Sequence, residues 1–450
     1  MKPRYERPVI VRHALGGWDK FGAASALKPV TQLGGVPIAE LVQAHGSPLF
    51  VFDEQVLRNR VRELRDQLAR RFSDFTIAWS YKTNYLGAIC AIFHEEGAWA
   101  EVVSGFELEK ALRAGVPGHQ IIFNGPGKRA GDVELALREG AQLNIDHLDE
   151  LALIEQVAER LGMTPKVGLR VNVANLPVDK WDRFGFTLEN GRALQAVRRL
   201  KRGGRLELSG LHCHIGTFVL DPNAYRLQAL AIARFARQIE VDHDMRIESI
   251  DLGGGFASHN TLHQQYLPGE EATPSLGQYV EAIGEGLDDG YEGAALPRIV
   301  LETGRALVDD AGTLVATVLA NKRLVDGRRA VVVDAGVNIL PTAWWYRHAV
   351  YPAQDTRGVS EPTVFFGPLC MNIDVVRQGV MFPPLQPGER VVIAHTGAYN
   401  VTQWQQFITA RPNVVLVSPN RQHALIRRAE TVDTLLAQEE MPSWLQAPTR

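Results

Sequence analysis

The sequence predicts a protein of two domains, an α/β domain that forms a (β/α)8 TIM barrel and an all-β domain that follows it. The chain has 450 residues, which is more than one ordinary hydrophobic core holds. Apolar runs of strand length alternate with helical patterns between residues 76 and 302. After Arg305 the helical patterns become rare, and short strands separated by turn signals replace them.

The alternating segments are regular enough to be assigned one by one. A strand at Pro48–Asp53 and a helix at 56–71 come first. Eight barrel strands are then expected at Thr76–Ser80, Trp99–Val103, Gln120–Phe123, Gln142–Ile145, Lys166–Asn172, Leu206–His214, Ile247–Leu252 and Arg298–Glu302. Helices are expected between them at Phe106–Arg113, Asp132–Glu139, Asp149–Leu161, Gly191–Arg202, Pro222–Ile239 and Ser275–Leu287. A doubly wound sheet is the rival, but no Gly-x-Gly-x-x-Gly follows the first of these eight strands.

The β domain is expected to be discontinuous in sequence. Residues 48–305 are assigned to the barrel, and residues 1–47 together with 306–450 to the β domain, a sandwich or barrel. Its strands are expected at Pro8–Arg12, Gly312–Arg323, Arg329–Val333, Thr363–Phe366, Arg390–His395, Asn413–Val417 and His423–Arg428. Residues after about 432 are expected to form a short helix and a frayed tail.

Composition narrows the class of protein. Hydrophobic content of 45% and charged content of 22% are typical of a globular chain. A net charge of −3 provides no broad field for nucleic acid or an anionic membrane, and no apolar run is long enough to span a bilayer. Three scattered cysteines do not form a disulfide framework, and the N-terminus leads into no signal-peptide core. We therefore expect a cytoplasmic protein that binds neither nucleic acid nor membrane.

One lysine stands where the first barrel strand ends. Lys82 follows the strand Thr76–Ser80 and has aromatic and apolar neighbours. Burial favours a neutral amine, which is a nucleophile suited to Schiff-base formation with a carbonyl, including the aldehyde of pyridoxal phosphate. The alternative is a strand-end lysine that extends to solvent.

Other polar residues gather at the expected carboxyl ends of the strands, where barrel active sites lie. Gly253, Gly254 and Gly255 follow the seventh strand, and Gly304-Arg305 follows the eighth. Together they predict a cup for a phosphate, because glycines let backbone N–H groups approach an anion and arginine supplies the opposite charge.

Other residues near the strand ends have both a functional and a structural interpretation. Glu302 either forms a salt bridge or keeps a pyridinium nitrogen protonated. His212 and His214 point to one side of their strand, but no third ligand stands out, so no metal is expected. Gly125-Pro126-Gly127-Lys128 lacks the spacing of a nucleotide loop.

With these motifs in place, the chain resembles the fold-type III pyridoxal-phosphate decarboxylases, the group of diaminopimelate, ornithine and arginine decarboxylases, from Pro48 to Tyr399. The resemblance implies an alanine-racemase-like barrel with a C-terminal β domain, pyridoxal 5'-phosphate as cofactor, and a homodimer with shared active sites. It implies catalytic roles for Lys82, His214 and Cys370, the last in the motif Phe366-Gly367-Pro368-Leu369-Cys370 that reaches the partner subunit. The implied cofactor-binding residues are Lys82, Glu101, Arg170, His214, Thr217, Gly253, Gly254, Gly255, Glu302, Gly304, Arg305 and Tyr399.

The sequence departs from the family at the positions expected to bind substrate. Members that act on diamino acids have an acidic residue after this cysteine, whereas Met371 stands here and Asp374 follows three residues later. The arginine-containing segment of diaminopimelate decarboxylases is replaced by a stretch that includes Trp344, Trp345 and Tyr346. We expect Met371, Asp374, Trp344 and Tyr346 to line the substrate pocket.

These departures favour a substrate whose distal end is acylated, or joined to a citrate-like or carrier group, as in siderophore or secondary-metabolite pathways. The first alternative is diaminopimelate decarboxylase of lysine biosynthesis. The others are an amino-acid racemase, which shares the layout, and a regulatory homologue without catalysis.

Overall fold

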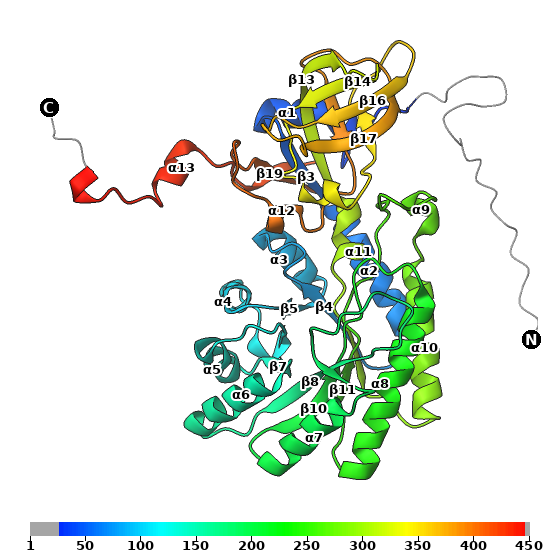
Figure 1. Cartoon of the computed structure of the whole chain (residues 1–450), viewed down its shortest axis with the longest axis vertical. Helices are drawn as coiled ribbons and strands as arrows, with labels where there is room; N and C mark the ends of the chain where they lie inside the picture. The colour runs from blue at the N-terminus through cyan, green and yellow to red at the C-terminus, as the bar shows by residue number, and fades with distance from the viewer. Residues whose placement is uncertain (1–26, 446–450) are drawn as a thin grey trace, which may run out of the picture.

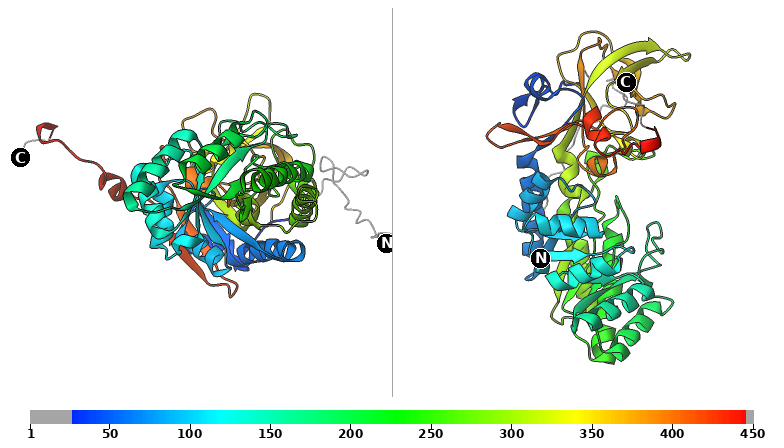
Figure 2. Two further views of the ribbon diagram at one scale, coloured as in Figure 1. Left: turned by 90° about the horizontal axis from the view of Figure 1, so that it is seen from below. Right: turned by 90° about the vertical axis from the view of Figure 1, so that its left-hand side faces the viewer.

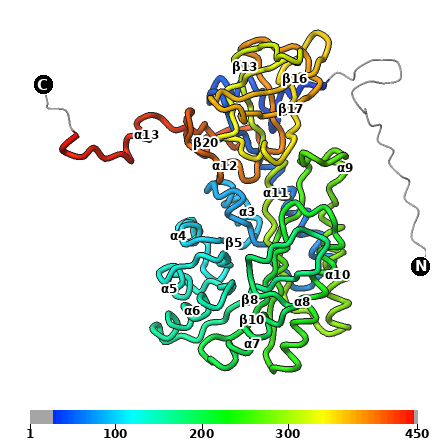
Figure 3. Tube along the Cα trace, viewed as in Figure 1, coloured from blue at the N-terminus to red at the C-terminus, as the bar shows by residue number. Residues whose placement is uncertain are grey.

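The computed structural model describes residues 27–445, and these form two lobes, a barrel and a β domain (Figures 1 and 3). Eight parallel strands close into the barrel in the order β4-β5-β6-β7-β8-β10-β11-β12, with β12 pairing back to β4. Their bounds are Phe75–Ser80 (β4), Trp99–Val102 (β5), Ile121–Phe123 (β6), Gln142–Ile145 (β7), Lys166–Asn172 (β8), Glu207–His212 (β10), Ser249–Asp251 (β11) and Arg298–Leu301 (β12). The predicted barrel is confirmed, and the short strand β9 (Phe186–Thr187) extends its sheet at β8.

Helices form a ring around these strands when the barrel is viewed from below (Figure 2). They are α3 (Gly87–Glu95), α4 (Gly105–Arg113), α5 (Ala130–Glu139), α6 (Leu148–Leu161), α7 (Arg192–Gly203), α8 (Pro222–His243) and α10 (Leu276–Tyr291). The helix α2 (Glu54–Arg71) precedes the first barrel strand and packs against both α3 and α10. It thus closes the ring where no long helix follows β12. No helix within residues 27–445 has the length and hydropathy needed to cross a bilayer.

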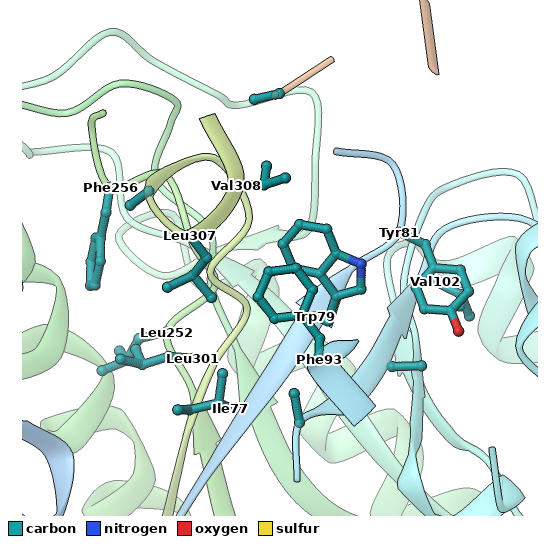
Figure 4. Packing of buried hydrophobic residues seen from close by; sticks show 14 of the residues in the cluster. Ile77, Trp79, Tyr81, Phe93, Val102, Leu252, Phe256, Leu301, Leu307 and Val308 are labelled. Atoms are coloured by element: carbon teal, nitrogen blue, oxygen red, sulfur yellow. The ribbon is translucent and has the colours of Figure 1, made fainter. Parts of the chain in front are cut away.

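Strand β4 is buried on both faces, as a barrel strand must be, and its side chains explain why. Trp79 stacks on Phe93 of α3, with ring centroids 3.9 Å apart, and Ile77 lies in the same apolar cluster (Figure 4). Leu307 and Val308 of the short helix α11 (Arg305–Val308) belong to the same cluster. This packing holds the strand that carries Lys82 against the segment that carries Arg305.

The β domain contains a second sheet, built around the long strand β13 (Gly312–Arg323). Its other strands are β3 (Leu49–Asp53), β14 (Arg329–Val333), β15 (Val350–Pro352), β16 (Glu361–Phe366), β17 (Val375–Phe382), β18 (Arg390–Ile393), β19 (Asn413–Val417) and β20 (His423–Arg427). The pairing of β3 with β13 and β19 corrects the boundary at residue 48, because this strand belongs to the β sheet and not to the barrel. Its apolar side chains complete the sheet between two other strands. Strands β15 and β17 were not predicted, and Pro8–Arg12 lies outside the described residues.

Several short elements lie at the ends and connections of the two lobes. The hairpin of β1 (Gln32–Leu33) and β2 (Val36–Pro37) leads into α1 (Ile38–His45). The helix α9 (Gly269–Ala272) lies on a loop that rises from the barrel toward the β domain, and α12 (Asn400–Gln403) lies beside the barrel (Figure 1). The last helix, α13 (Val432–Leu436), projects away from the body of the molecule (Figure 1).

Candidate active site

Lys82 lies directly beyond β4 and forms an ion pair with Glu101 of β5. Glu101 is fully buried and also accepts hydrogen bonds from the Ser80 hydroxyl and, at 3.1 Å, from Asn124 Nδ2. Burial alone would lower the pKa of Lys82, but the charges of Glu101 and Glu302 outweigh it and raise the pKa. The expectation that burial keeps this amine neutral is therefore wrong for the chain by itself, because two carboxylates face it.

Glu302 follows β12 and belongs to a buried group with His212 and Asp251. The distance from His212 Nε2 to Glu302 Oε2 is 3.4 Å, and Asn124 Nδ2 donates to Glu302 Oε1 at 2.5 Å. Burial alone would raise the pKa of Glu302, but His212 and Lys82 outweigh it and hold this pKa well below its usual range. Burial and the neighbouring Glu302 charge raise the pKa of Asp251. The protein therefore favours negative charge on Glu302.

His212, Asp251 and Glu302 are also close enough together to be compared with a metal site. Their ligand atoms lie within 4.8 Å of one another, so Asp251 and Glu302, not His214, are the neighbours of His212. The sequence left His212 without a third ligand, because the partners come from two other strands. His214 instead accepts a hydrogen bond from the Gly254 N–H at 3.1 Å.

The glycine run after β11 leaves room for a ligand's anionic group close to the backbone. Gly253 and Gly255 have φ of +67° and +94°, in the left-handed region that favours glycine. A Cβ on Gly254 would lie 2.2 Å from the Glu302 carbonyl oxygen. Arg305 lies beside this run, and its Nε and Nη1 are buried without a hydrogen-bond partner in the described chain. Buried guanidinium donors of this kind require an anion.

Aromatic rings and one hydroxyl surround the Arg305 guanidinium. Its Cζ lies 4.7 Å from the ring centroid of Tyr399 and 5.1 Å from that of Tyr346. Its Nη2 donates to Thr217 Oγ1 at 3.4 Å. The structure thus brings together Thr217, the glycine run, Arg305 and Tyr399, as the predicted cup requires. Gly304 has no space for a side chain, because a Cβ would lie 2.1 Å from Thr83 Oγ1.

Arg170 lies on β8, and His214 follows the neighbouring strand β10. Burial, with Lys82 and Arg170 nearby, lowers the pKa of His214 to about 3, so its imidazole is neutral. The ring of Trp181 meets it edge-on at 5.2 Å. Arg170 donates to Asp146 at 3.3 Å and lies over the ring of Phe184. Arg170 therefore has its own anionic partner, unlike Arg305.

The β domain is hydrogen-bonded to residues 82–84, here called the lysine loop. The Tyr399 N–H donates to the Thr83 carbonyl at 2.8 Å, and the Thr402 hydroxyl donates to the Lys82 carbonyl at 2.9 Å. Asn84 Nδ2 donates to the Gly397 carbonyl at 3.1 Å. These contacts join residues more than 300 positions apart, so no sequence pattern could have revealed them. Asn124 was also missed, although it follows β6 at a carboxyl end where the strand-end rule could have found it.

The residues expected to read substrate are less concentrated. Cys370 is exposed on the connection between β16 and β17, and the described chain gives it no hydrogen bond to the barrel mouth. Met371 is half-buried beside the core, Trp344 is 44% exposed, and Tyr346 is buried beside Arg305.

Asp374 differs most from its expected role. Its two oxygens accept hydrogen bonds from the Val337 and Leu369 N–H groups at 2.8 and 2.7 Å, and the residue is 1% exposed. Asp374 therefore holds its own loop together, and its expected contact with substrate stays a prediction.

A second lysine of the barrel, Lys128, is fully occupied by its own partners. Its Nζ donates to the Gly125 and Asn144 carbonyls at 2.8 and 3.0 Å and to Glu150 at 2.6 Å. Three partners and complete burial of the side chain make this a structural cation. The side chain of Lys82, in contrast, is 37% exposed and has Glu101 as its ion-pair partner.

Comparison with known proteins agrees with this geometry. The chain matches the pyridoxal-dependent decarboxylase family, pyridoxal-binding domain, over residues 55–309. It is similar to diaminopimelate decarboxylase of Zymomonas mobilis, with 31% identity over 428 residues, 91% of this chain and 96% of that protein. The corresponding enzyme of Bacillus subtilis is 28% identical over 419 residues, 90% of this chain and 94% of that protein. The crystal structure of diaminopimelate decarboxylase from M. jannaschii in complex with L-lysine has a TM-score of 0.84 and 27% identity, covering 92% of this chain and 96% of that one.

Fold and barrel mouth together define an enzyme that uses pyridoxal phosphate. The chain belongs to the pyridoxal-dependent decarboxylase family, and it is a carboxy-lyase acting on amino acids.

The residues at the barrel mouth fit this cofactor. The two unpartnered donors of Arg305 and the glycine run suit a phosphate. Lys82 would supply the amine for the aldehyde, and Glu302, held ionised, suits a protonated ring nitrogen. The phosphate and the protonated ring would therefore each face a residue of opposite charge.

Proposed function

We propose that this enzyme decarboxylates an α-amino acid whose distal end is acylated or joined to a carboxylate-bearing or carrier group, at a site shared by two copies of the chain in the cytoplasm. Siderophore and secondary-metabolite pathways use such substrates. Diaminopimelate decarboxylation is the alternative, and the similarity to relatives of that name along nine-tenths of the chain favours it.

Each residue at the mouth has a distinct task in this proposal. Lys82 would hold the cofactor through its amine until the amine of the substrate replaces it. When bound, pyridoxal phosphate supplies the electron sink that accepts the electron pair left as CO2 departs. Glu302 holds a proton at the ring nitrogen. Arg305 and Tyr399 secure the phosphate end, which fixes the orientation of the reacting bond.

Two more side chains complete the reaction. His214 would hold the ring of the cofactor in place, and its low pKa means that it does so as a neutral imidazole. Cys370 of the second copy delivers a proton to Cα after CO2 has left. The exposure of Cys370 in a single chain supports a role across an interface.

One observation carries the substrate assignment: in the described segment from Met371 to Asp374, the one carboxylate is already bonded on both oxygens. Met371 occupies the position next to the cysteine, and both oxygens of Asp374 are held by backbone N–H groups. Burying an ammonium ion without a partner costs several kcal/mol, about the penalty for an unpaired buried charge. A substituted distal end avoids that cost.

The test compares kcat/KM, measured as CO2 release, for meso-diaminopimelate, ornithine, lysine and distally acylated analogues of each. We expect an acylated substrate to exceed its free counterpart by at least about a hundredfold, equivalent to roughly 2.7 kcal/mol. A free diamino acid turned over at about 10⁴ M⁻¹s⁻¹ or better would overturn the substrate assignment and favour the alternative. Release of no CO2 from any substrate, with racemisation instead, would contradict the reaction itself.

A further inference from the structure

A second cavity lies outside the cofactor site, between the loop that carries α9 and the β domain. Its volume is about 340 Å³, the size of a small-molecule site. The residues that line it are different from those of the cup. The Arg347 N–H donates to the Thr261 carbonyl, and the His263 N–H donates to the Trp345 carbonyl. These bonds join the two segments that line it.

Two arginines line this cavity, Arg347 directly after Tyr346 and Arg377 on β17. Arg347 and Arg377 both line it, and the Nε atom of each is buried without a hydrogen-bond partner. Arg347 otherwise donates to the Gln265 carbonyl, and Arg377 to the Gln378 carbonyl at 3.3 Å. Within residues 27–445 neither guanidinium forms an ion pair with a carboxylate. Both residues are half-buried, and a buried guanidinium Nε without a partner is a donor that a ligand could satisfy.

The charge of Arg347 also acts on Arg377. Burial first, and then repulsion by Arg347, lower the pKa of Arg377 to about 10. Such a lowering means that the positive charge lacks compensation in the isolated chain. Any anion placed between the two guanidinium groups would relieve it.

The other titratable groups at the cavity leave it receptive to an anion. His259 and His395 line it, and each directs Nδ1 to Asp310 behind the wall, at 2.7 and 2.8 Å. Burial would lower the pKa of His395, but Asp310 outweighs burial and raises it. Glu270 is the acidic residue on the lining, and its carboxylate lies toward His395 Nε2, at 3.9 Å, and not toward either arginine.

We propose that Arg347 and Arg377 form a second ligand site, which binds a small oxyanion carrying carboxylate or phosphate groups. The site goes beyond the proposed decarboxylase function and does not depend on it. Guanidinium groups pair with planar and tetrahedral oxyanions through two N–H donors at once, and here the buried Nε atoms are among those donors. The ligand bridges the barrel loop and the β domain, so its binding also fixes these two parts relative to each other.

The test uses the holoenzyme, in which pyridoxal phosphate occupies the cup, and titrates it with citrate and separately with inorganic phosphate by isothermal calorimetry. We expect saturable binding of at least one probe. Arg377→Gln should weaken it at least tenfold, which corresponds to about 1.4 kcal/mol. The tighter of the two probes identifies whether carboxylate or phosphate is recognised.

A matched control is Arg198→Gln, which removes an exposed arginine from α7, where Arg198, Lys201 and Arg202 line a surface hollow. It should leave the affinity unchanged. Thermal unfolding without ligand gives a second readout, because loss of the unpaired Arg377 charge should raise Tm, whereas loss of a merely structural side chain should lower it. Arg377→Lys, which keeps the charge, should retain part of the affinity.

Binding that is equal in wild type and Arg377→Gln, or absent with both probes, would overturn the site. So would a change in sedimentation from dimer to monomer caused by Arg377→Gln, because the second copy would then be supplying the missing charge. Because the readout is affinity and not CO2 release, failure here leaves the proposed function standing.

Discussion

At the scale of single residues, neighbours decide how the charged groups of this protein behave. Lys82 is charged because Glu101 and Glu302 face it, and Glu302 is ionised because His212 and Lys82 face it. His348 shows the opposite case. It is fully buried, with no carboxylate among its partners, and burial lowers its pKa to about 3.

That pKa leads to a prediction about acid stability. Folded His348 binds its proton near pH 3, but an ordinary histidine does so near 6.5, so between these values the unfolded chain binds more protons. Stability should therefore fall as pH falls from 6.5 toward 3, and His348 should contribute up to about 1.4 kcal/mol per pH unit. His348→Gln should make this part of the curve shallower, measured by urea unfolding at several pH values.

His348→Gln should also lower the free energy of unfolding at neutral pH, because it removes two hydrogen bonds of the imidazole. These bonds join it to Thr342 and to the Ala394 carbonyl, at 2.9 and 3.1 Å. The slope, and not the absolute stability, is therefore the readout. The exposed His119→Gln should follow the wild-type curve. A slope unchanged in His348→Gln would contradict the argument.

At the scale of elements, the segments that follow the strands carry Lys82, Glu302 and the glycine run, and the strands themselves add Glu101 and Arg170. The run after β11 approaches the Glu302 backbone so closely that even a methyl group at Gly254 would lie 2.2 Å from its carbonyl oxygen. The same loop places the Gly254 N–H against His214. Cofactor binding and local packing therefore depend on the same few atoms.

Gly254→Ala should separate this loop from Glu302. The forced shift should cost about 1–3 kcal/mol of unfolding free energy and weaken pyridoxal phosphate at least tenfold, measured by absorbance titration. Gly131→Ala is the matched control, because a Cβ there meets nothing within 4 Å and lies in the first turn of α5. That substitution should stabilise the protein by up to about 1 kcal/mol and leave the affinity unchanged. Equal behaviour of the two variants would refute the close-contact argument.

At the scale of the whole molecule, the β domain contributes to the barrel mouth in two ways. Tyr399 and Thr402 bond to the backbone of the lysine loop within one chain. Cys370 lies on the connection between β16 and β17. It has no such contact in the described chain, and it is exposed. A site completed by a second copy follows from the proposed function.

Subunit exchange tests this arrangement. Lys82→Ala and Cys370→Ala should each be inactive, and Lys82→Ala should also lose the label fixed by borohydride. Mixing the two under conditions that exchange subunits should restore about a quarter of the wild-type rate, since half of the dimers are hybrids with one intact site. Exchange confirmed by mass, with no return of activity, would show that each site belongs to one chain.

Much of the molecule could be predicted from the sequence, because the relevant signals are local. The alternation of apolar strands and amphipathic helices defines the barrel, and the strand-end rule locates Lys82, Glu302 and Arg305 before any coordinates. Gly253 and Gly255 are likewise recognisable, since a left-handed backbone at a strand end selects glycine.

Only the tertiary structure decided how residues far apart in sequence meet. Strand β3 pairs with β13 and β19 across more than 250 residues, Asp374 is bonded to its own loop, and Arg347 and Arg377 face one cavity without a counter-charge. Local patterns report which face of an element is apolar, and they carry no record of which polar partner lies opposite. The charge of Lys82 depends on that partner, because in a buried site the field of a neighbouring carboxylate outweighs the penalty of desolvation.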